Sequence, residues 1–67
     1  MQQAQANTDF ALSMKAQAHE VQVHRWIESE KAGHDLGTEA ELDWVRRFAK
    51  RFRDEWNAGM IDKTIYC

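Results

Sequence analysis

Helix-breaking residues are confined to three positions in this chain of 67 residues. There is no proline, and the three glycines stand at positions 33, 37 and 59. Proline and glycine interrupt helices more strongly than any other residue, so their placement leaves two long segments free to become helical. The sequence therefore predicts an all-α fold, with one helix over about residues 9–32 and a second over about residues 38–58.

The first predicted helix has both a start signal and a stop signal. A polar lead-in over residues 1–7, either frayed helix or coil, precedes it, and Asn7 or Thr8 can accept hydrogen bonds from its first backbone amides. Gly33 can adopt the left-handed conformation that commonly ends a helix. The connection over residues 33–37 has the length that joins antiparallel neighbours, so we expect the two helices to pair as a hairpin.

The second predicted helix is bounded in the same way. Thr38 and Glu41 have the spacing of a capping box, in which each side chain accepts a hydrogen bond from the other residue's backbone amide. Gly59 provides the stop, and residues 59–67 form a short tail. A chain of this length makes one small domain, so residues 1–67 are expected to form a single antiparallel helical hairpin with a short C-terminal tail.

The second helix carries its apolar residues on one side when successive residues are placed about 100° apart. This side comprises Leu42, Val45, Phe48, Ala49, Phe52 and Trp56, with Trp44 at its margin. A helix with one apolar side needs one neighbour.

The first helix carries apolar residues on two opposite sides. One side comprises Phe10, Met14, Ala18, Val21 and Ala32, and the other comprises Leu12, Ala16, Val23, Trp26 and Ile27. A polar seam between them contains Ser13, Gln17, Glu20 and His24. A helix with two apolar sides needs two neighbours, and the second helix can cover only one side.

The uncovered side of the first helix indicates an interface. Exposed apolar surface that includes a tryptophan usually marks a binding site, and a chain this small buries only a thin core of its own. Cys67 is the only cysteine, so no internal disulfide can add support. In one arrangement the tail itself folds over the uncovered side. The favoured arrangement is contact with a second copy or a larger protein assembly through Leu12, Ala16, Val23, Trp26, Ile27, Ile61, Ile65 and Tyr66.

A cluster of basic residues supports a second hypothesis, a homodimeric four-helix bundle that binds nucleic acid. Five of the nine basic residues fall in eight consecutive positions and could contact phosphate groups: Arg46, Arg47, Lys50, Arg51 and Arg53. However, Asp43 and Asp54 have the spacing of helical ion pairs with Arg47 and Lys50. The aromatic residues within the cluster are also needed for the apolar side. A solvated helix face is therefore the favoured interpretation.

A third hypothesis places the second helix on a membrane surface. Its basic residues would face water, while Trp44 and Trp56 would insert among lipids. This arrangement competes directly with pairing between the two helices, because both use the same apolar side.

No combination of residues points to catalysis. Glu20, His24 and Glu28 share one face of the first helix. Metal sites in helical bundles need an answering histidine motif from other helices, and the second helix has no histidine. Neither serine nor the terminal cysteine has a base placed to activate it. We therefore expect no enzyme activity and no catalytic, metal or cofactor site.

The charge and composition are ordinary for a soluble protein. The formal net charge of −2, with 30% charged residues, gives no overall attraction to nucleic acid. The N-terminus lacks the basic start and apolar core of a secretion signal, and no apolar run is long enough to cross a bilayer. We expect a small non-catalytic accessory or regulatory subunit, cytoplasmic or on the cytosolic face of a membrane complex.

Overall fold

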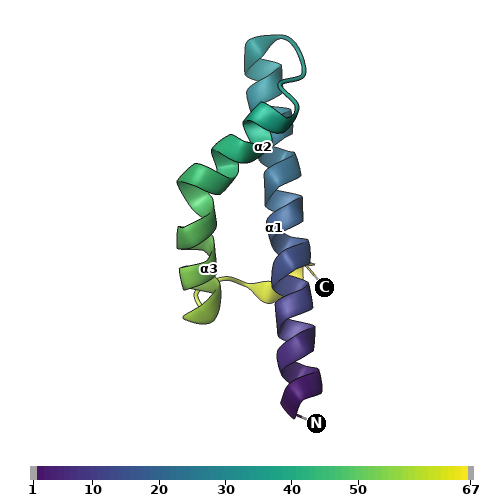
Figure 1. Cartoon of the computed structure of the whole chain (residues 1–67), viewed down its shortest axis with the longest axis vertical. Helices are drawn as coiled ribbons and strands as arrows, with labels where there is room; N and C mark the ends of the chain where they lie inside the picture. Colours follow the sequence, from purple (N-terminus) through teal and green to yellow (C-terminus); the bar gives the residue numbers. More distant parts are fainter. Residues whose placement is uncertain (1, 67) are drawn as a thin grey trace.

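The chain forms an all-α helical hairpin, as the sequence predicts. The computed structural model describes the backbone of residues 2–66 and the side chains of residues 9–66. Its elements are α1 (Gln2–Ala32), α2 (Thr38–Trp44), a π-helical turn η1 (Val45–Ala49), α3 (Lys50–Asn57) and a 3₁₀ turn η2 (Lys63–Tyr66). The segment from α2 to α3 runs antiparallel to α1, and the tail crosses back from α3 to α1 (Figure 1). Cys67, for which the sequence excludes an internal disulfide, lies outside the described residues.

Both predicted helix ends are confirmed by glycines in the left-handed conformation. Gly33 has a φ of 79°, and its amide donates to the Ser29 carbonyl at 2.9 Å. Gly59 has a φ of 74°, and the amide of Met60 donates to the Glu55 carbonyl at 2.9 Å. The second pattern is a Schellman motif, which satisfies carbonyls that the end of a helix leaves without partners.

The predicted start of the second helix at residue 38 is confirmed, whereas the predicted start of the first helix at about residue 9 is wrong. The helix α1 begins at Gln2, because the glutamine- and alanine-rich lead-in contains good helix formers and no breaker. The capping box is absent as well. Gly37 takes the N-cap position of α2, no side chain caps the helix, and the Glu41 carboxylate accepts a hydrogen bond from Arg25 at 2.9 Å. Glu41 therefore joins α2 to α1 instead of closing the first turn of α2.

The π-helical turn changes which side of the second helix is buried. Ala40, Trp44, Ala49 and Trp56 are buried, and Trp44 and Ala49 are five residues apart. A π turn brings residues i and i+5 closer to the same side, whereas an uninterrupted α-helix would place Ala49 about 140° around the helix from Trp44. Trp44, predicted at the margin, is therefore buried in the core.

The same turn explains which apolar residues remain exposed. Leu42, Val45 and Phe48, all predicted on the buried side, keep between 38% and 50% of their surface. The extra residue in the turn also bends the segment, so that α2 and α3 follow different directions relative to α1 (Figure 1). The prediction of one continuous apolar side is wrong because it assumed an unbroken α-helical period.

The second helical segment packs against a polar seam of α1. The half-buried residues of this seam are Ser13, Gln17, Glu20 and His24. His24 Nε2 lies 2.8 Å from Asp43 Oδ2, and its ring meets Phe48 edge-on with 5.7 Å between ring centroids. Because the seam faces the partner helix, the two apolar sides of α1 lie along the two edges of the hairpin.

An aromatic cluster fills the wider end of the hairpin. Trp56 is 2% exposed and stacks on Phe52, with 5.9 Å between ring centroids. Phe52 also meets Trp44 at 5.8 Å, and the tail adds Tyr66, whose ring lies 6.1 Å from that of Trp56. These rings bridge α2, α3 and the tail, and their burial provides much of the apolar stabilisation of this small fold.

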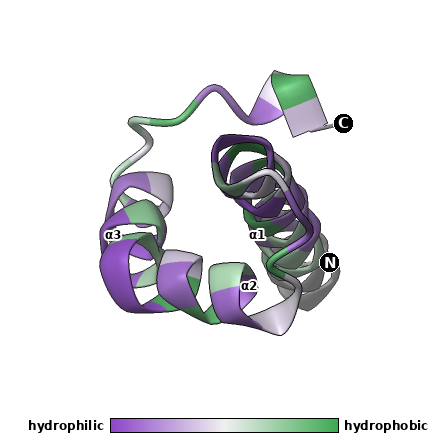
Figure 2. Ribbon diagram, turned by 90° about the horizontal axis from the view of Figure 1, so that it is seen from above, coloured by the Kyte–Doolittle hydropathy of each residue, from purple (hydrophilic) through white to green (hydrophobic). Residues whose placement is uncertain are grey.

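The tail is anchored at two points on α1. Lys63 Nζ lies 2.9 Å from Asp9 Oδ1 and 4.7 Å from the centre of the Trp56 ring, and the Trp56 indole donates to Asp9 Oδ2 at 3.3 Å. Further along α1, the Tyr66 hydroxyl donates to Glu20 Oε2 at 3.0 Å. Viewed along the helices, the tail crosses one edge of the hairpin (Figure 2).

The tail covers part of the side of α1 that we expected to meet a partner. Leu12 and Ala16 lie between the two anchor residues Asp9 and Glu20. Leu12 is half-buried, and Ala16 has no exposed surface. Contrary to the prediction, Ala16 therefore offers no contact to a partner. The arrangement in which the tail folds over this side is present along the N-terminal half of α1.

The ionisation of Tyr66 should report whether the tail is docked. Burial, together with the hydrogen bond to Glu20 and its charge, raises the pKa of Tyr66 to about 12, against about 10 in an unfolded chain. A raised pKa means that the neutral phenol stabilises the fold fully below pH 10, and that this stabilisation is lost as the pH rises toward 12.

Tyr66 is the only tyrosine, so its near-ultraviolet absorbance reports this ionisation directly. We expect the native chain to titrate about two pH units above a sample unfolded in denaturant, since the two pKa values are about 12 and 10. A native titration that matches the unfolded one would show that the tail does not dock.

Candidate interaction surface

An apolar groove lies between α1 and the η1–α3 segment, next to the docked tail. Its volume is about 360 Å³. It is lined by Glu20, Val23, His24, Ile27, Trp44, Phe48, Arg51, Phe52 and Glu55. Glu20 is both an anchor of the tail and a wall of the groove, so the groove adjoins the place where Tyr66 docks on α1. We refer to this feature as the apolar groove.

The charged residues around the apolar groove are already paired. His24 contacts Asp43 at 2.8 Å, and Arg51 Nε lies 3.0 Å from Glu55 Oε2. Partly exposed pairs of this kind contribute little energy by themselves, but they leave few charges in need of a partner. Any binding in the groove should therefore be driven by its apolar walls.

Apolar surface continues from the groove onto the outer side of α1. Val23 lines the groove, and Trp26 lies one helical turn further along, where it is 65% exposed. Ile27 is 40% exposed on the groove side. We call Val23, Trp26, Ile27 and Phe48 the groove surface, because Val23, Ile27 and Phe48 line the groove and the exposed Trp26 follows Val23 by one turn of α1.

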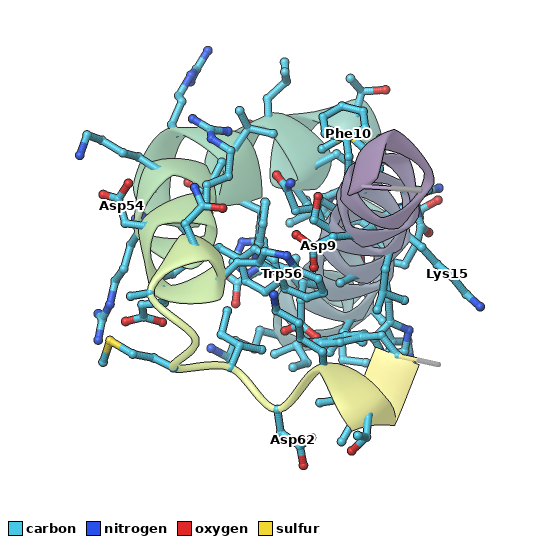
Figure 3. The ribbon with its side chains drawn as sticks, turned by 90° about the horizontal axis from the view of Figure 1, so that it is seen from below. Asp9, Phe10, Lys15, Asp54, Trp56 and Asp62 are labelled. Atoms are coloured by element: carbon cyan, nitrogen blue, oxygen red, sulfur yellow. The ribbon has the colours of Figure 1, made fainter. Side chains whose placement is uncertain are left out.

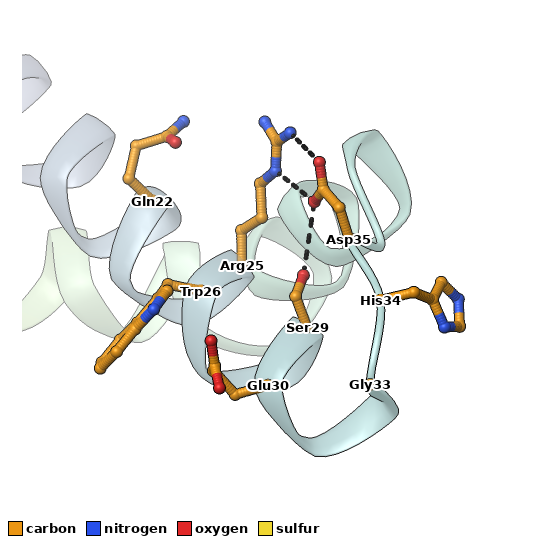
Figure 4. A pocket seen from close by; sticks show the side chains of 8 residues that line it. All are labelled: Gln22, Arg25, Trp26, Ser29, Glu30, Gly33, His34 and Asp35. Carbon is orange, nitrogen blue, oxygen red and sulfur yellow. Dashed lines mark hydrogen bonds and ion pairs between the residues drawn. The ribbon is translucent and has the colours of Figure 1, made fainter.

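A second hollow of about 470 Å³ lies beside Trp26 near the loop between α1 and α2 (Figure 4). Its polar wall is held together by Arg25. The guanidinium contacts Asp35 at 2.6 and 3.0 Å and Glu41 at 2.9 Å, and Ser29 Oγ accepts the Leu36 amide at 2.9 Å. These contacts fix the loop and α2 against α1, so this hollow is better explained as a structural joint than as a ligand site.

The charges in this joint stabilise one another. Hydrogen bonds from Arg25 and from the Gly37 amide hold the pKa of Asp35 well below its usual range. The hydrogen bonds from Arg25 to Asp35 and Glu41 raise the pKa of the guanidinium. Arg25 therefore stays charged at every pH at which the chain is folded, and Asp35 stays ionised until the solution is strongly acidic.

The structure brings together some of the predicted interface residues and separates others. Val23 and Ile27 line the apolar groove, whereas Trp26 lines the neighbouring hollow near the loop between α1 and α2. In the tail, Ile61 and Tyr66 are half-buried. Ile65 is exposed, and with Tyr66 it lines a separate hollow beside Lys15 and His19. The predicted surface is therefore divided between the groove and the tail.

Phe48 is the groove residue that the sequence interpretation did not assign to an interface. It was expected to pack inside the hairpin. The sequence carried no signal for this position, because only the structure shows that Trp44 and Ala49, five residues apart, are both buried and joined by a π turn. This turn leaves Phe48 on the groove.

The basic run is largely neutralised by neighbouring carboxylates. The two predicted ion pairs are present, Arg47 with Asp43 at 3.1 Å and Lys50 with Asp54 at 2.9 Å, and Arg51 pairs with Glu55. Arg46 and Arg53 form no ion pair with the side chains of residues 9–66. Two separate arginines make a weaker phosphate-binding surface than the five predicted basic residues.

The described side chains give little support to a membrane-surface helix or to a metal site on α1. Trp44 and Trp56, which a membrane-surface helix would expose, are 6% and 2% exposed. Glu20, His24 and Glu28 contact Tyr66, Asp43 and Lys31 respectively. Within residues 9–66, three or more histidine, aspartate or glutamate side chains never gather at metal-binding distance.

No protein-family model, no curated protein and no solved structure matches this chain. Its own residues therefore carry every functional inference. Among the described residues, no helix combines the length and the hydropathy that crossing a membrane requires.

Replacing Arg25 should loosen the joint between the loop, α2 and α1. We expect Arg25→Gln to lower the thermal unfolding midpoint by several degrees, because Asp35 and Glu41 lose their cation together. Lys50→Gln is the matched control, since Lys50 and Asp54 form an exposed pair within a single helix, and it should leave the midpoint nearly unchanged.

The effect of Arg25→Gln should also depend on pH. The lowered pKa of Asp35 means that its contribution is present above the ordinary aspartate pKa and is lost as the pH falls through the folded value. Circular dichroism melts should therefore separate Arg25→Gln from the native chain at neutral pH and much less in strong acid. Equal melting of Arg25→Gln and Lys50→Gln at neutral pH would contradict the assignment.

Proposed function

We propose that this chain is a small non-catalytic accessory or regulatory subunit that docks onto a larger protein. The observation that carries the proposal is the groove surface, in which Trp26 is 65% exposed beside an apolar groove with paired charges at its rim. Exposed apolar surface of this kind is typical of protein–protein interfaces, and tryptophan is among the residues that contribute most to binding energy. We place this function in the cytoplasm, or at the cytosolic face of a membrane complex.

The apolar groove suits one kind of partner, an amphipathic helix of the larger protein. Two diverging helical segments form its walls, and Val23, Ile27 and Phe48 present apolar side chains to whatever lies between them. A helix inserts its apolar residues into such a groove at intervals of three and four positions. The paired charges at the rim would then face solvent beside the polar side of the bound helix.

Burial of the groove surface is large enough to support binding. A large apolar side chain that becomes fully buried contributes about 1.5–3 kcal/mol. The four residues of the groove surface are already partly covered, so their combined contribution is about half of the full amount. This contribution must still offset the loss of translational and rotational freedom on association. Trp26 has the most surface left to bury and should be the single most sensitive position.

The test compares Trp26→Asp with Leu42→Asp in a pull-down from host cells followed by quantitative mass spectrometry. Both residues are exposed and apolar, but Trp26 lies one turn of α1 from the groove residue Val23, whereas Leu42 lies on α2 and does not line the groove. We expect one protein to be enriched equally by the native chain and Leu42→Asp, and to be lost at least tenfold with Trp26→Asp. Circular dichroism should show the same helix content in both variants.

Equal enrichment by both variants would contradict the proposal, as would equal loss. Light scattering on the purified chain tests the alternative of a homodimeric four-helix bundle. A stable dimer that Trp26→Asp converts to a monomer would support that bundle. Binding of RNA or DNA by the dimer, lost when Arg46 and Arg53 are replaced, would support the nucleic-acid hypothesis.

A further inference from the structure

The tail and the apolar groove lie along the same face of α1. The tail is anchored to α1 at Asp9 and Glu20. The α1 wall of the groove continues from Glu20 to Val23 and Ile27. Because successive residues of an α-helix are about 100° apart, these four residues fall within about 60° of one another around α1. The docked tail and the open groove therefore occupy successive stretches of one helix face.

Tyr66 closes the end of the groove by contacting both of its walls. Its hydroxyl donates to Glu20 Oε2 on the α1 wall at 3.0 Å. Its ring meets that of Phe52 on the α3 wall, with 6.4 Å between ring centroids. Beyond this point, Asp9 and Trp56 point toward one another between α1 and α3 (Figure 3). A helix bound in the groove therefore cannot continue along α1 past Glu20 while the tail is docked.

The open stretch is short for a partner helix. From Glu20 to Ile27 it spans about 10 Å at ~1.5 Å per residue, which is two helical turns. Release of the tail would extend the face to Asp9, a span of about 27 Å. It would also uncover the rings of Phe52 and Trp56, against which the tail packs. The position of the tail therefore sets the length of helix that this face can bind.

The tail has the features of a segment that detaches without unfolding the rest. Residues 60–62 form no helix or strand. Met60 and Ile65 remain 72% and 69% exposed, so the tail buries few of its own apolar side chains. The pair of Lys63 with Asp9 is partly exposed on both sides, and such pairs contribute little energy. Segments with little buried apolar surface open locally at the lowest free energy.

We propose that the tail is a strap that competes with a partner helix for this face of α1. When docked, the strap limits the partner to the groove between Glu20 and Ile27, and when released it opens the longer face. This inference rests on the proposed function, because it concerns the length of the same groove. A partner helix of five turns displaces the strap, whereas a helix of two turns leaves it docked. Weaker docking of the strap therefore means tighter binding of a long helix.

Two variants of the full chain release the strap at different anchors. Lys63→Glu places a carboxylate against Asp9, and Tyr66→Ser removes the ring that lies between the two walls. Lys31→Glu is the matched control for the change of charge, because Lys31 pairs with Glu28 at the other end of α1.

Release of the strap is measured in chains that keep Trp56 as their only tryptophan, with phenylalanine at the other two positions. Trp56 is 2% exposed in the docked state. Lys63→Glu and Tyr66→Ser should each increase its quenching by acrylamide severalfold, whereas Lys31→Glu should leave the quenching unchanged.

The binding probes are two uncharged amphipathic peptides, both held helical by lactam bridges. Each has leucine at every third or fourth position and alanine or glutamine elsewhere. The short peptide has about eight residues, enough for the open stretch, and the long peptide has about 18, enough for the whole face. The short peptide should bind the native chain and all three variants equally.

We expect the long peptide to bind both strap variants about tenfold more tightly than it binds the native chain or Lys31→Glu. The apparent affinity of a ligand falls with the fraction of molecules in the competent state, and a minor state is populated at roughly a tenth or less. Fluorescence anisotropy of labelled peptides measures all of these affinities.

Equal affinity of the long peptide for the native chain and both strap variants, absence of binding included, would overturn the proposal. So would weaker binding of both peptides by the strap variants, which would show that Tyr66 builds the groove instead of closing it. If Tyr66→Ser loses helix content by circular dichroism, Lys63→Glu decides alone, because it leaves the aromatic cluster intact. The pull-down with Trp26→Asp changes no tail residue, so the proposed function stands or fails separately.

Discussion

The contact between α2 and the polar seam of α1 determines the rest of this structure. His24 contacts Asp43 at 2.8 Å, and Arg25 contacts Glu41 at 2.9 Å, so charged and hydrogen-bonding groups set the orientation of the two helices. Apolar burial alone would favour placing an apolar side of α1 directly against the second helix. Because the polar seam faces the second helix instead, both apolar sides of α1 lie along the edges of the hairpin.

The tail covers only one of the two edges of the hairpin. Along one edge, the tail docks at Asp9 and Glu20, which lie on either side of the buried Ala16 in the sequence, and it adds Tyr66 to the aromatic cluster but leaves the apolar groove open. Along the other edge, no segment among residues 9–66 covers Phe10. The π turn adds to this division, because it brings Trp44 into the core and leaves Phe48 on the groove. Function, as we propose it, follows from surface that the fold does not cover.

The sequence predicted the features that depend on local residue chemistry. The absence of proline predicted two helices, and Gly33 and Gly59 marked where they end. The pairs of Arg47 with Asp43 and Lys50 with Asp54 followed from helical spacing. Val23, Trp26 and Ile27 were placed on an accessible apolar side, and all three keep exposed surface or line the groove.

The features that depend on tertiary contacts could not be predicted in this way. Glu41 fitted a capping box, but Arg25 offered it a charged partner on another helix. Trp44 was placed at a margin because an α-helical period does not anticipate a π turn, whose cost is met by burying a large ring. The unpaired amide nitrogen of Gln17 was not predicted either, since only the packed structure shows which buried polar atoms lack a partner.

Fluorescence quenching of single-tryptophan chains tests the central claim most directly, namely that the second helix turns Trp44 inward and the hairpin leaves Trp26 outside. Each chain keeps one of the three tryptophans, with the other two replaced by phenylalanine. The structure predicts that acrylamide quenches Trp26, which is 65% exposed, several times more strongly than Trp44 or Trp56, which are 6% and 2% exposed. If Trp44 is quenched as strongly as Trp26, the structure is contradicted, because this result would indicate an unbroken α-helix with Trp44 at the exposed margin of its apolar side.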